Sequence, residues 1–133
     1  MSDAEIARLE RLIAYLEGLG YEVHNAHRRE AWGRSFLAPE ECTRQDFDEI
    51  AACELFVAFP GAPPSPGTHV EIGWASALGK RMVLLLEEGA TYAFLVEGLP
   101  SVANVTLLRI PPGSDGVEQL AAALESDRPR ATS

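Results

Sequence analysis

The stretch from Ser65 to Glu71 combines side chains that can hold an anion with one that can attack an electrophilic carbon. Glu71 carries a carboxylate, which is a possible nucleophile. Ser65 offers a hydroxyl in the preceding loop, and Gly67 removes side-chain bulk where a ligand could approach the backbone. An apolar run at residues 55–59 predicts a buried strand just before this stretch, joined to it by a proline-rich loop.

A helix is predicted over residues 68–78, closed by Gly79 in a left-handed conformation. Free backbone N–H groups point outward from the first turn of a helix, and open α/β sheets bind ligands where a strand leads into a helix. We expect Glu71 in that first turn, where the helix dipole favours an ionised carboxylate. The same position suits a carboxylate that is only a dipole partner, and both interpretations remain open, with the nearby Ser65 and Gly67 favouring a nucleophile.

A basic cluster follows residues 21–26, whose alternating pattern predicts a short strand. The cluster begins with His27, Arg28 and Arg29. A loop beyond the carboxyl end of a strand faces the ligand crevice, and the planar guanidinium of arginine suits phosphate. The alternative is a solvated loop in which the arginines pair with neighbouring carboxylates.

Two further features each allow two interpretations. Trp32 and Phe36 either form a stacking wall for a base or cover the core. Asp46 lies in a helix predicted from Pro39 to Cys53, where it is either an exposed helix carboxylate or part of a pocket.

The bulk properties narrow the class of protein. The 133 residues, 47% of them hydrophobic, suit one compact domain. A net charge of −9 argues against binding a nucleic-acid polymer but does not exclude a mononucleotide as the ligand. No apolar run approaches the ~20 residues of a membrane span, so no membrane partner is expected. Cys42 and Cys53 lie too far apart along one helix to form a disulfide, which suggests a cytoplasmic protein.

The predicted elements alternate between strands and helices. The strands are expected at 21–26, 55–59, 81–86 and 105–110. The helices are expected from a Ser2 cap to Gly18, then at 39–53, 68–78, 92–97 (a short helix or turn) and 116–124. This order predicts an α/β sandwich with a parallel sheet, forming one domain over residues 1–126 with a disordered tail at 127–133. The histidines lack grouped partners at ligand spacing, so neither a metal nor a cofactor is predicted.

The pattern S-x-G-x-x-x-E-x-G-x-A at residues 65–75, which follows a buried strand, resembles the nucleoside 2-deoxyribosyltransferase superfamily. That superfamily includes the 2'-deoxynucleoside 5'-phosphate N-hydrolases. The similarity is greatest to the CMP and hydroxymethyl-CMP hydrolases of blasticidin S and mildiomycin biosynthesis. Residues 25–33, 56–61, 65–76 and 92–96 carry the resemblance, which covers roughly residues 5–110.

The resemblance implies a Rossmann-like or flavodoxin-like three-layer sandwich. It also implies hydrolysis of the N-glycosidic bond of a pyrimidine nucleoside 5'-monophosphate, CMP or hydroxymethyl-CMP. In this scheme Glu71 is the nucleophile, and Glu54 or Asp46 assists the departing base. The residues expected to bind the substrate are Ser65, Gly67, Thr68, His27, Arg28, Arg29 and Trp32.

The chain departs from the superfamily at its start. The superfamily has five strands, the first of them ahead of the first helix here. We therefore expect that the start is truncated, that a partner chain fills the gap, or that activity has been lost. A homodimer with weak or no activity is expected in this form. Two alternative functions remain open: a nucleoside deoxyribosyltransferase, which the basic loop disfavours because it suits a phosphorylated substrate, and a non-catalytic nucleotide-binding protein.

Overall fold

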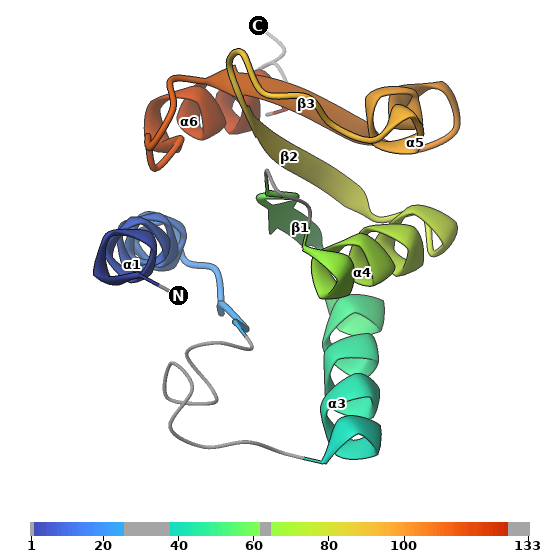
Figure 1. Cartoon of the computed structure of the whole chain (residues 1–133). Helices are drawn as coiled ribbons and strands as arrows, with labels where there is room; N and C mark the ends of the chain where they lie inside the picture. Colours follow the sequence, from blue (N-terminus) through green and yellow to red (C-terminus); the bar gives the residue numbers. More distant parts are fainter. Residues whose placement is uncertain (1, 26–37, 62–64, 128–133) are drawn as a thin grey trace, which may run out of the picture.

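The computed structural model describes residues 2–25, 38–61 and 65–127 (Figure 1). Its helices are α1 (Asp3–Gly18), α3 (Pro39–Ala52), α4 (Pro66–Ala77), α5 (Phe94–Glu97) and α6 (Val117–Ser126), with a 3₁₀ turn η2 at Leu99–Ser101. Its strands are β1 (Leu55–Ala58), β2 (Arg81–Glu87) and β3 (Val105–Ile110). The strands form a parallel sheet in the order β1-β2-β3. The predicted α/β class and the Rossmann-like arrangement with a parallel sheet are confirmed.

The segment at 21–25 does not form the strand that the sequence predicted, and Ala26 lies outside the described residues. Tyr21 and Val23 are nevertheless partly buried against the core on the side of α1 and α6. Their alternating side chains therefore pack on the core without backbone pairing to the sheet. For this reason the described part of the chain has three strands where four were predicted.

The central strand β2 sends its side chains alternately to two cores. Met82, Leu84 and Leu86 pack with residues of α3, α4 and α5, whereas Val83 and Leu85 pack with residues of α1 and α6. All five side chains are at most 1% exposed, which explains the continuous apolar run in the sequence. Helices α1 and α6 thus lie on one side of the sheet and α4 on the other, with α3 in contact with α4 (Figure 1).

The ends of three helices follow local signals in the sequence. Ser2 Oγ accepts a hydrogen bond from the backbone N–H of Glu5 at 3.2 Å, which confirms the cap of α1. Pro39 begins α3, as predicted for a residue without a backbone N–H. Gly79 has a φ of 72°, which confirms the left-handed stop after α4.

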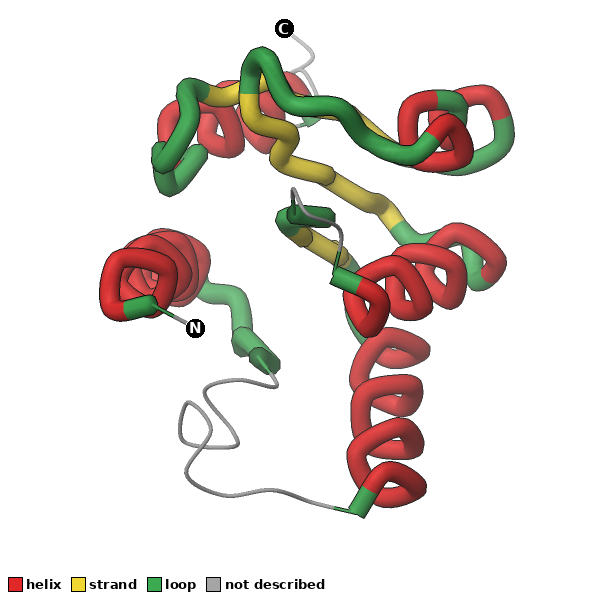
Figure 2. Tube along the Cα trace, in the orientation of Figure 1, coloured by secondary structure: helices red, strands yellow, loops and turns green. Residues whose placement is uncertain are grey.

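The loops that follow β2 and β3 lie at the same end of the sheet (Figure 2). The hydroxyl of buried Tyr92 accepts a hydrogen bond from the backbone N–H of Glu87 at 2.7 Å. The Glu87 carboxylate accepts another from the backbone N–H of Gly113 at 3.0 Å. Because the strands are parallel, β1 also ends at this edge, which we call the carboxyl edge, and open α/β sheets bind ligands there.

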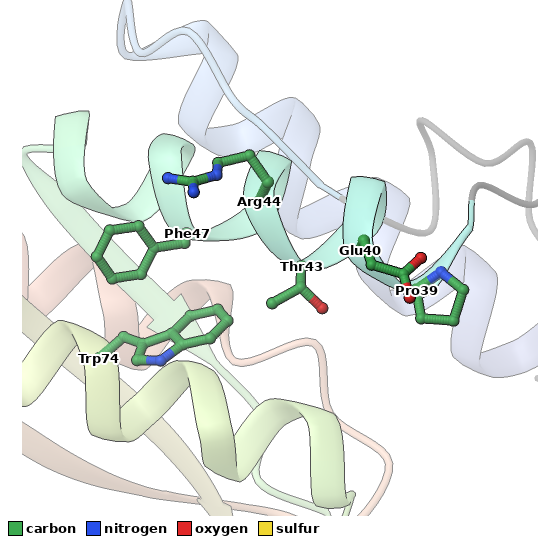
Figure 3. A pocket seen from close by; sticks show the side chains of 6 residues that line it. All are labelled: Pro39, Glu40, Thr43, Arg44, Phe47 and Trp74. Atoms are coloured by element: carbon green, nitrogen blue, oxygen red, sulfur yellow. The ribbon is translucent and has the colours of Figure 1, made fainter.

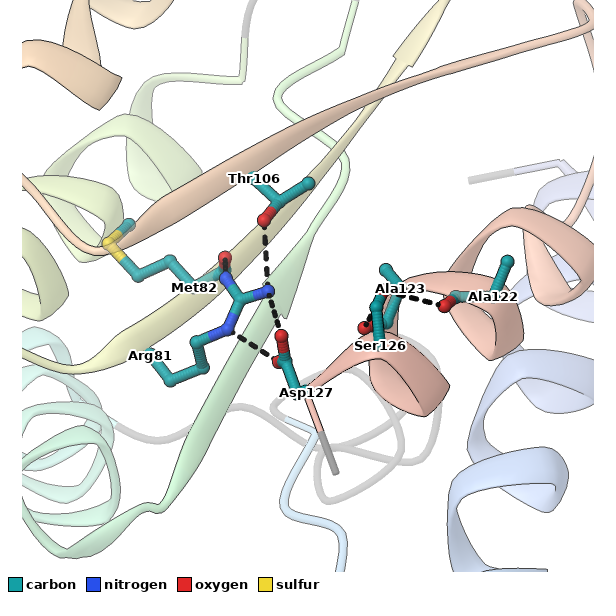
Figure 4. Close-up of polar contacts among 7 residues, drawn as sticks. All are labelled: Arg81, Met82, Thr106, Ala122, Ala123, Ser126 and Asp127. Carbon is teal, nitrogen blue, oxygen red and sulfur yellow. Dashed lines mark hydrogen bonds and ion pairs between the residues drawn. The ribbon is translucent and has the colours of Figure 1, made fainter. Parts of the chain in front are cut away.

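The opposite, amino edge of the sheet is held by Arg81 (Figure 4). Its Nε donates to Asp127 at 2.8 Å, Nη2 to the Thr106 hydroxyl at 2.9 Å, and Nη1 to the Met82 carbonyl at 2.5 Å. These bonds tie the start of β2 to β3 and to the end of α6. Asp127, at the start of the expected tail, is therefore held by the sheet, and residues 128–133 lie outside the described residues.

Candidate active site

The amino end of α4 is built around Ser65. Its backbone N–H donates to the carbonyl of Pro60 at 3.0 Å, which closes the loop onto the end of β1. Its Oγ accepts hydrogen bonds from the Thr68 backbone N–H at 3.5 Å and from the Thr68 hydroxyl at 3.0 Å. Ser65 therefore caps α4, and Pro66 takes the first helical position, where no backbone N–H is needed.

Glu71 lies in the second turn of α4, and the prediction that placed it in the first turn is wrong. The helix begins at Pro66, two residues earlier than expected, because Ser65 provides the cap. The favourable effect of the helix dipole decays within the first turn, so it supports the charge of Glu71 less than the sequence suggested. The side chain is partly exposed.

Gly67 is the second residue of α4 and is exposed. A Cβ atom at this position would meet no described atom within 4 Å, and the backbone is not in the left-handed region. The described fold therefore does not require glycine here. The open space above the first turn is where a ligand could approach the backbone N–H groups.

Glu71 lies on a helix that packs against α3. Glu71 and Trp74 lie three residues apart and so share a face of α4. The Trp74 ring meets Phe47 of α3 edge-on, with ring centroids 5.3 Å apart and an interplanar angle of 87° (Figure 3). Asp46 is the sequence neighbour of Phe47, so the structure places Asp46 and Glu71 on two helices that pack against each other.

Asp46 is partly buried, and its Oδ2 accepts a hydrogen bond from the Cys42 thiol at 3.7 Å. Glu49, three residues later on the same face of α3, lies 3.7 Å from His24 Nδ1. This face therefore points toward the segment that leads into the basic cluster. The predicted binding residues in that cluster lie outside the described residues: His27, Arg28, Arg29 and Trp32.

Glu54 lies at the amino edge of the sheet, immediately before β1. It is exposed and lines a hollow of about 530 Å³ together with Leu55 and Arg81, among others. Ser65, by contrast, is attached through Pro60 to the carboxyl edge. The structure therefore brings Ser65, Gly67 and Thr68 together at one end of β1 and places Glu54 at the other.

A groove of about 550 Å³ runs along α3 (Figure 3). It is lined by Pro39, Glu40, Thr43, Arg44, Phe47 and Trp74. The α3 residues in this set recur at the spacing of one helix face, a signal that is present in the sequence. Asp46 and Glu49 are not among the residues that line the groove.

Arg8 and Glu87 are two further candidate residues that the sequence does not mark. The Arg8 guanidinium carbon lies 4.2 Å from the centroid of the Phe59 ring, and Nη1 lies 3.6 Å from Glu87 Oε1. Phe59 follows β1 and Glu87 ends β2, so the three side chains meet at the carboxyl edge. No local signal could have revealed this group, because its members come from three distant parts of the chain.

The environment of Cys53 makes its thiol an unfavourable nucleophile. Burial raises the pKa of the Cys53 thiol, an effect that Lys80 partly offsets, so the thiol is protonated at neutral pH and is a poor nucleophile. Both Cys42 and Cys53 are free.

Over 2–25, 38–61 and 65–127, no three His, Cys, Asp or Glu side chains are grouped to hold a metal ion. No helix in those ranges is long and apolar enough to cross a membrane.

Comparison with known proteins places this geometry in context. The family model described as nucleoside 2-deoxyribosyltransferase matches residues 1–106. The structure of the Clostridium botulinum CMP N-glycosidase BcmB is 45% identical, with a TM-score of 0.78 and 90% of each chain covered. The solution structure of BlsM is 50% identical, with a TM-score of 0.83, and the match covers 100% of this chain and 86% of BlsM. No curated protein matches the chain.

Proposed function

Because the chain belongs to the nucleoside 2-deoxyribosyltransferase family, we propose that it is an N-glycosidase that acts on a pyrimidine nucleoside 5'-monophosphate. The substrate is CMP or hydroxymethyl-CMP, and the products are the free base and ribose 5-phosphate. The observation that carries this proposal is the 45% identity, over 90% of both chains, to an enzyme described as a CMP N-glycosidase. The capped, open amino end of α4 supports it, because such helix ends bind phosphate.

In this proposal Glu71 is the nucleophile. Breaking the bond between the base and the sugar develops positive charge at the anomeric carbon, which a carboxylate stabilises. The carboxylate then forms a covalent bond to that carbon as the base leaves with the bonding electrons. Water attacks the same carbon in a second step, releasing ribose 5-phosphate and restoring the free carboxylate, as in retaining glycosidases.

The departing pyrimidine needs a proton or a hydrogen bond, and we assign this role to Asp46. Asp46 lies on α3, which packs against the helix that carries Glu71. Glu54, the other carboxylate that the sequence suggested, lies at the amino edge, away from the loop that would hold the phosphate. The position of Glu54 therefore favours Asp46.

The 5'-phosphate is assigned to the first turn of α4. The Ser65 hydroxyl and the Gly67 backbone N–H supply donors there, and Thr68, whose hydroxyl and backbone N–H donate to Ser65 Oγ, holds that hydroxyl in place. The sequence places further positive charge in Arg28 and Arg29, which lie outside the described residues. Recognition of the phosphate would distinguish a nucleotide substrate from a nucleoside.

We also propose that the protein forms a homodimer through α5. Phe94 and Leu95 are 92% and 87% exposed. Large apolar residues that are exposed side by side mark a surface that binds another protein chain. Helix α5 leads through η2 into β3, and Figure 1 shows it at the end of the sheet where β3 begins. A second copy of the chain bound to this surface would form the dimer that the family resemblance implies.

The experiment that tests the reaction incubates the purified protein with CMP, hydroxymethyl-CMP, dCMP and cytidine. Free base and sugar phosphate are quantified by chromatography, and a second set of reactions contains added adenine. The proposal predicts base release from a nucleotide and the same products with or without adenine. A new nucleoside or nucleotide of adenine would instead identify a transferase, the second function that the family model favours. Nucleotide binding without base release would identify a non-catalytic protein.

A further inference from the structure

The Arg8 guanidinium is largely buried but poorly hydrogen-bonded. Its side chain is only 17% exposed. The 3.6 Å separation between its Nη1 and Glu87 Oε1 is too long for a good hydrogen bond. Within the described part of the chain, its Nε atom is buried and has no hydrogen-bond partner. Burying a charged donor without a partner is unfavourable, so this arrangement needs an explanation.

Arg81 provides a matched comparison in the same molecule. Its side chain is 19% exposed, almost the same as that of Arg8. All three nitrogens of its guanidinium donate hydrogen bonds, to Asp127, Thr106 and Met82 (Figure 4). Arg81, a largely buried arginine that serves only the fold, therefore has a hydrogen-bond acceptor for each nitrogen of its guanidinium. The contrast with Arg81 points to an acceptor for the Arg8 guanidinium that is not part of the described chain.

The position of Arg8 indicates which acceptor this is. Phe59, beneath the guanidinium, directly precedes Pro60, whose carbonyl binds the backbone N–H of Ser65 at 3.0 Å. Phe59 packs on the side of the sheet covered by α1 and α6, whereas α4 covers the other side. Arg8 and the amino end of α4 therefore flank the end of β1 from opposite faces. A ligand above that end would meet both.

We propose that Arg8 binds a phosphate oxygen of the nucleotide and determines the preference for nucleotides over nucleosides, an inference that rests on the proposed function. Phosphate accepts charge-assisted hydrogen bonds from the planar guanidinium, and this would satisfy donors of Arg8. The Phe59 ring and the Glu87 carboxylate hold the guanidinium in place before the ligand binds. The Gly113 N–H, bound to Glu87 at 3.0 Å, disperses part of the carboxylate charge that would repel a phosphate.

The test compares Arg8→Met, Arg8→Lys and the control Arg11→Met. Methionine retains an apolar side chain over Phe59 but removes the charge and the donors. Lysine restores the charge without the planar fork. Arg11 lies on the same helix and pairs with Asp115 at 3.0 Å, so its substitution removes an ion pair of α1 that is not assigned to the substrate. Two measurements are made on each protein: kcat/KM for CMP and for cytidine, and the rise in unfolding temperature caused by ribose 5-phosphate.

Arg8→Met is expected to lower the preference for CMP over cytidine by about 10- to 100-fold, the effect of losing a hydrogen bond to a charged group. Arg8→Lys should recover part of that preference, and Arg11→Met should match the wild type. The proposal would be overturned if Arg8→Met leaves the preference unchanged, or if it lowers kcat/KM equally for both substrates together with the unfolding temperature. Either result would show that Arg8 only holds α1 against the sheet.

The binding measurement separates this proposal from the proposed reaction. If the wild type releases no base from any nucleotide, the proposed N-glycosidase reaction is wrong. The thermal shift caused by ribose 5-phosphate still tests whether Arg8 binds phosphate. Stabilisation of the wild type and Arg11→Met, but not of Arg8→Met, supports phosphate binding by Arg8. Equal stabilisation of all three proteins, or of none, overturns it.

Discussion

The Ser65 hydroxyl lies 3.0 Å from the Thr68 hydroxyl and also accepts the Thr68 backbone N–H, so the side chain assigned to the phosphate is at the same time the cap of α4. A substitution at Ser65 therefore affects both the stability of the helix and the proposed binding site. The two effects can be separated, because Ser2 caps α1 in the same way, far along the chain from α4.

Ser65→Ala should lower the free energy of unfolding by about 1 kcal/mol, the usual effect of losing a serine cap. It should also lower kcat/KM for CMP by roughly 10-fold or more, because a hydrogen bond to a charged phosphate is lost. Ser2→Ala, the matched control, should show the loss of stability alone. Urea unfolding and the base-release assay measure the two quantities, and equal activity losses in both variants would remove Ser65 from phosphate binding.

Gly67→Ala should have opposite effects on stability and activity. Alanine forms helices better than glycine by about 1 kcal/mol, and a Cβ here meets no described atom within 4 Å, so the fold should be unharmed or stabilised. The same Cβ would enter the space proposed for the phosphate and should raise KM for CMP.

The control for this change is Gly18→Ala, at the last residue of α1, where an added Cβ also meets no described atom. It should leave KM for CMP unchanged. Thermal unfolding and substrate titration give both readouts. A Gly67→Ala protein with unaltered KM would show that nothing approaches the backbone at this position.

Glu71→Gln should abolish base release and leave the fold intact. Glutamine has nearly the same shape as glutamate but cannot act as an anionic nucleophile. Chromatographic quantification of free cytosine from CMP measures the effect, and circular dichroism checks the fold. Turnover at the wild-type rate would exclude Glu71 from the mechanism.

Two further amide substitutions show which carboxylate assists the base. Asp46→Asn should lower kcat by about 10²- to 10⁴-fold, the usual contribution of a general acid. Glu54→Gln is the matched control, because Glu54 lies at the amino edge, and it should retain near-wild-type kcat. A large loss in Glu54→Gln with none in Asp46→Asn would reverse the assignment.

Asp115 should contribute a pH-dependent part of the stability. The Val117 backbone N–H that it caps, helped by Arg11 and opposed by burial, lowers the pKa of its carboxyl group. A folded pKa below the unfolded value of about 4 stabilises the fold above that pH, and the contribution is lost as the pH falls through the folded pKa. The stability difference between wild type and Asp115→Asn should therefore be constant from about pH 7 to pH 5 and shrink below about pH 4.

Asparagine retains an oxygen that can cap α6, so this difference reports mainly the charge. Urea unfolding at a series of pH values measures it. A difference that widens toward low pH would contradict the assigned direction of the pKa shift.

Phe94→Glu should convert a dimer into monomers, because it introduces a charge into the apolar surface proposed as the interface. Leu19→Glu is the control: Leu19 is also an exposed large apolar residue, but it lies at the end of α1, on the side of Glu54. Light scattering over a range of protein concentrations measures the association. A wild type that is monomeric throughout, or a Phe94→Glu protein that dimerises normally, would rule out the α5 interface.

Much of this fold could be predicted from the sequence because the signals that form it are local. Ser2, Pro39 and Gly79 act on the helix turns directly beside them, so their roles follow from neighbouring residues. The apolar run of β2 likewise predicts a strand buried on both faces. Ser65, Gly67 and Thr68 lie together at the amino end of α4, as their adjacency in the chain predicts.

Only the tertiary structure decided features that depend on distant partners. The alternation at Tyr21 and Val23 indicates side chains that pack on a core. A strand also needs hydrogen bonds to the backbone of a neighbouring strand, and this segment makes no such pairing in the described sheet. Glu54 lies at the amino edge because β1 runs away from it toward Pro60. Arg8 reaches Phe59 and Glu87 because α1 lies over the ends of β1 and β2, a contact set by packing across the chain.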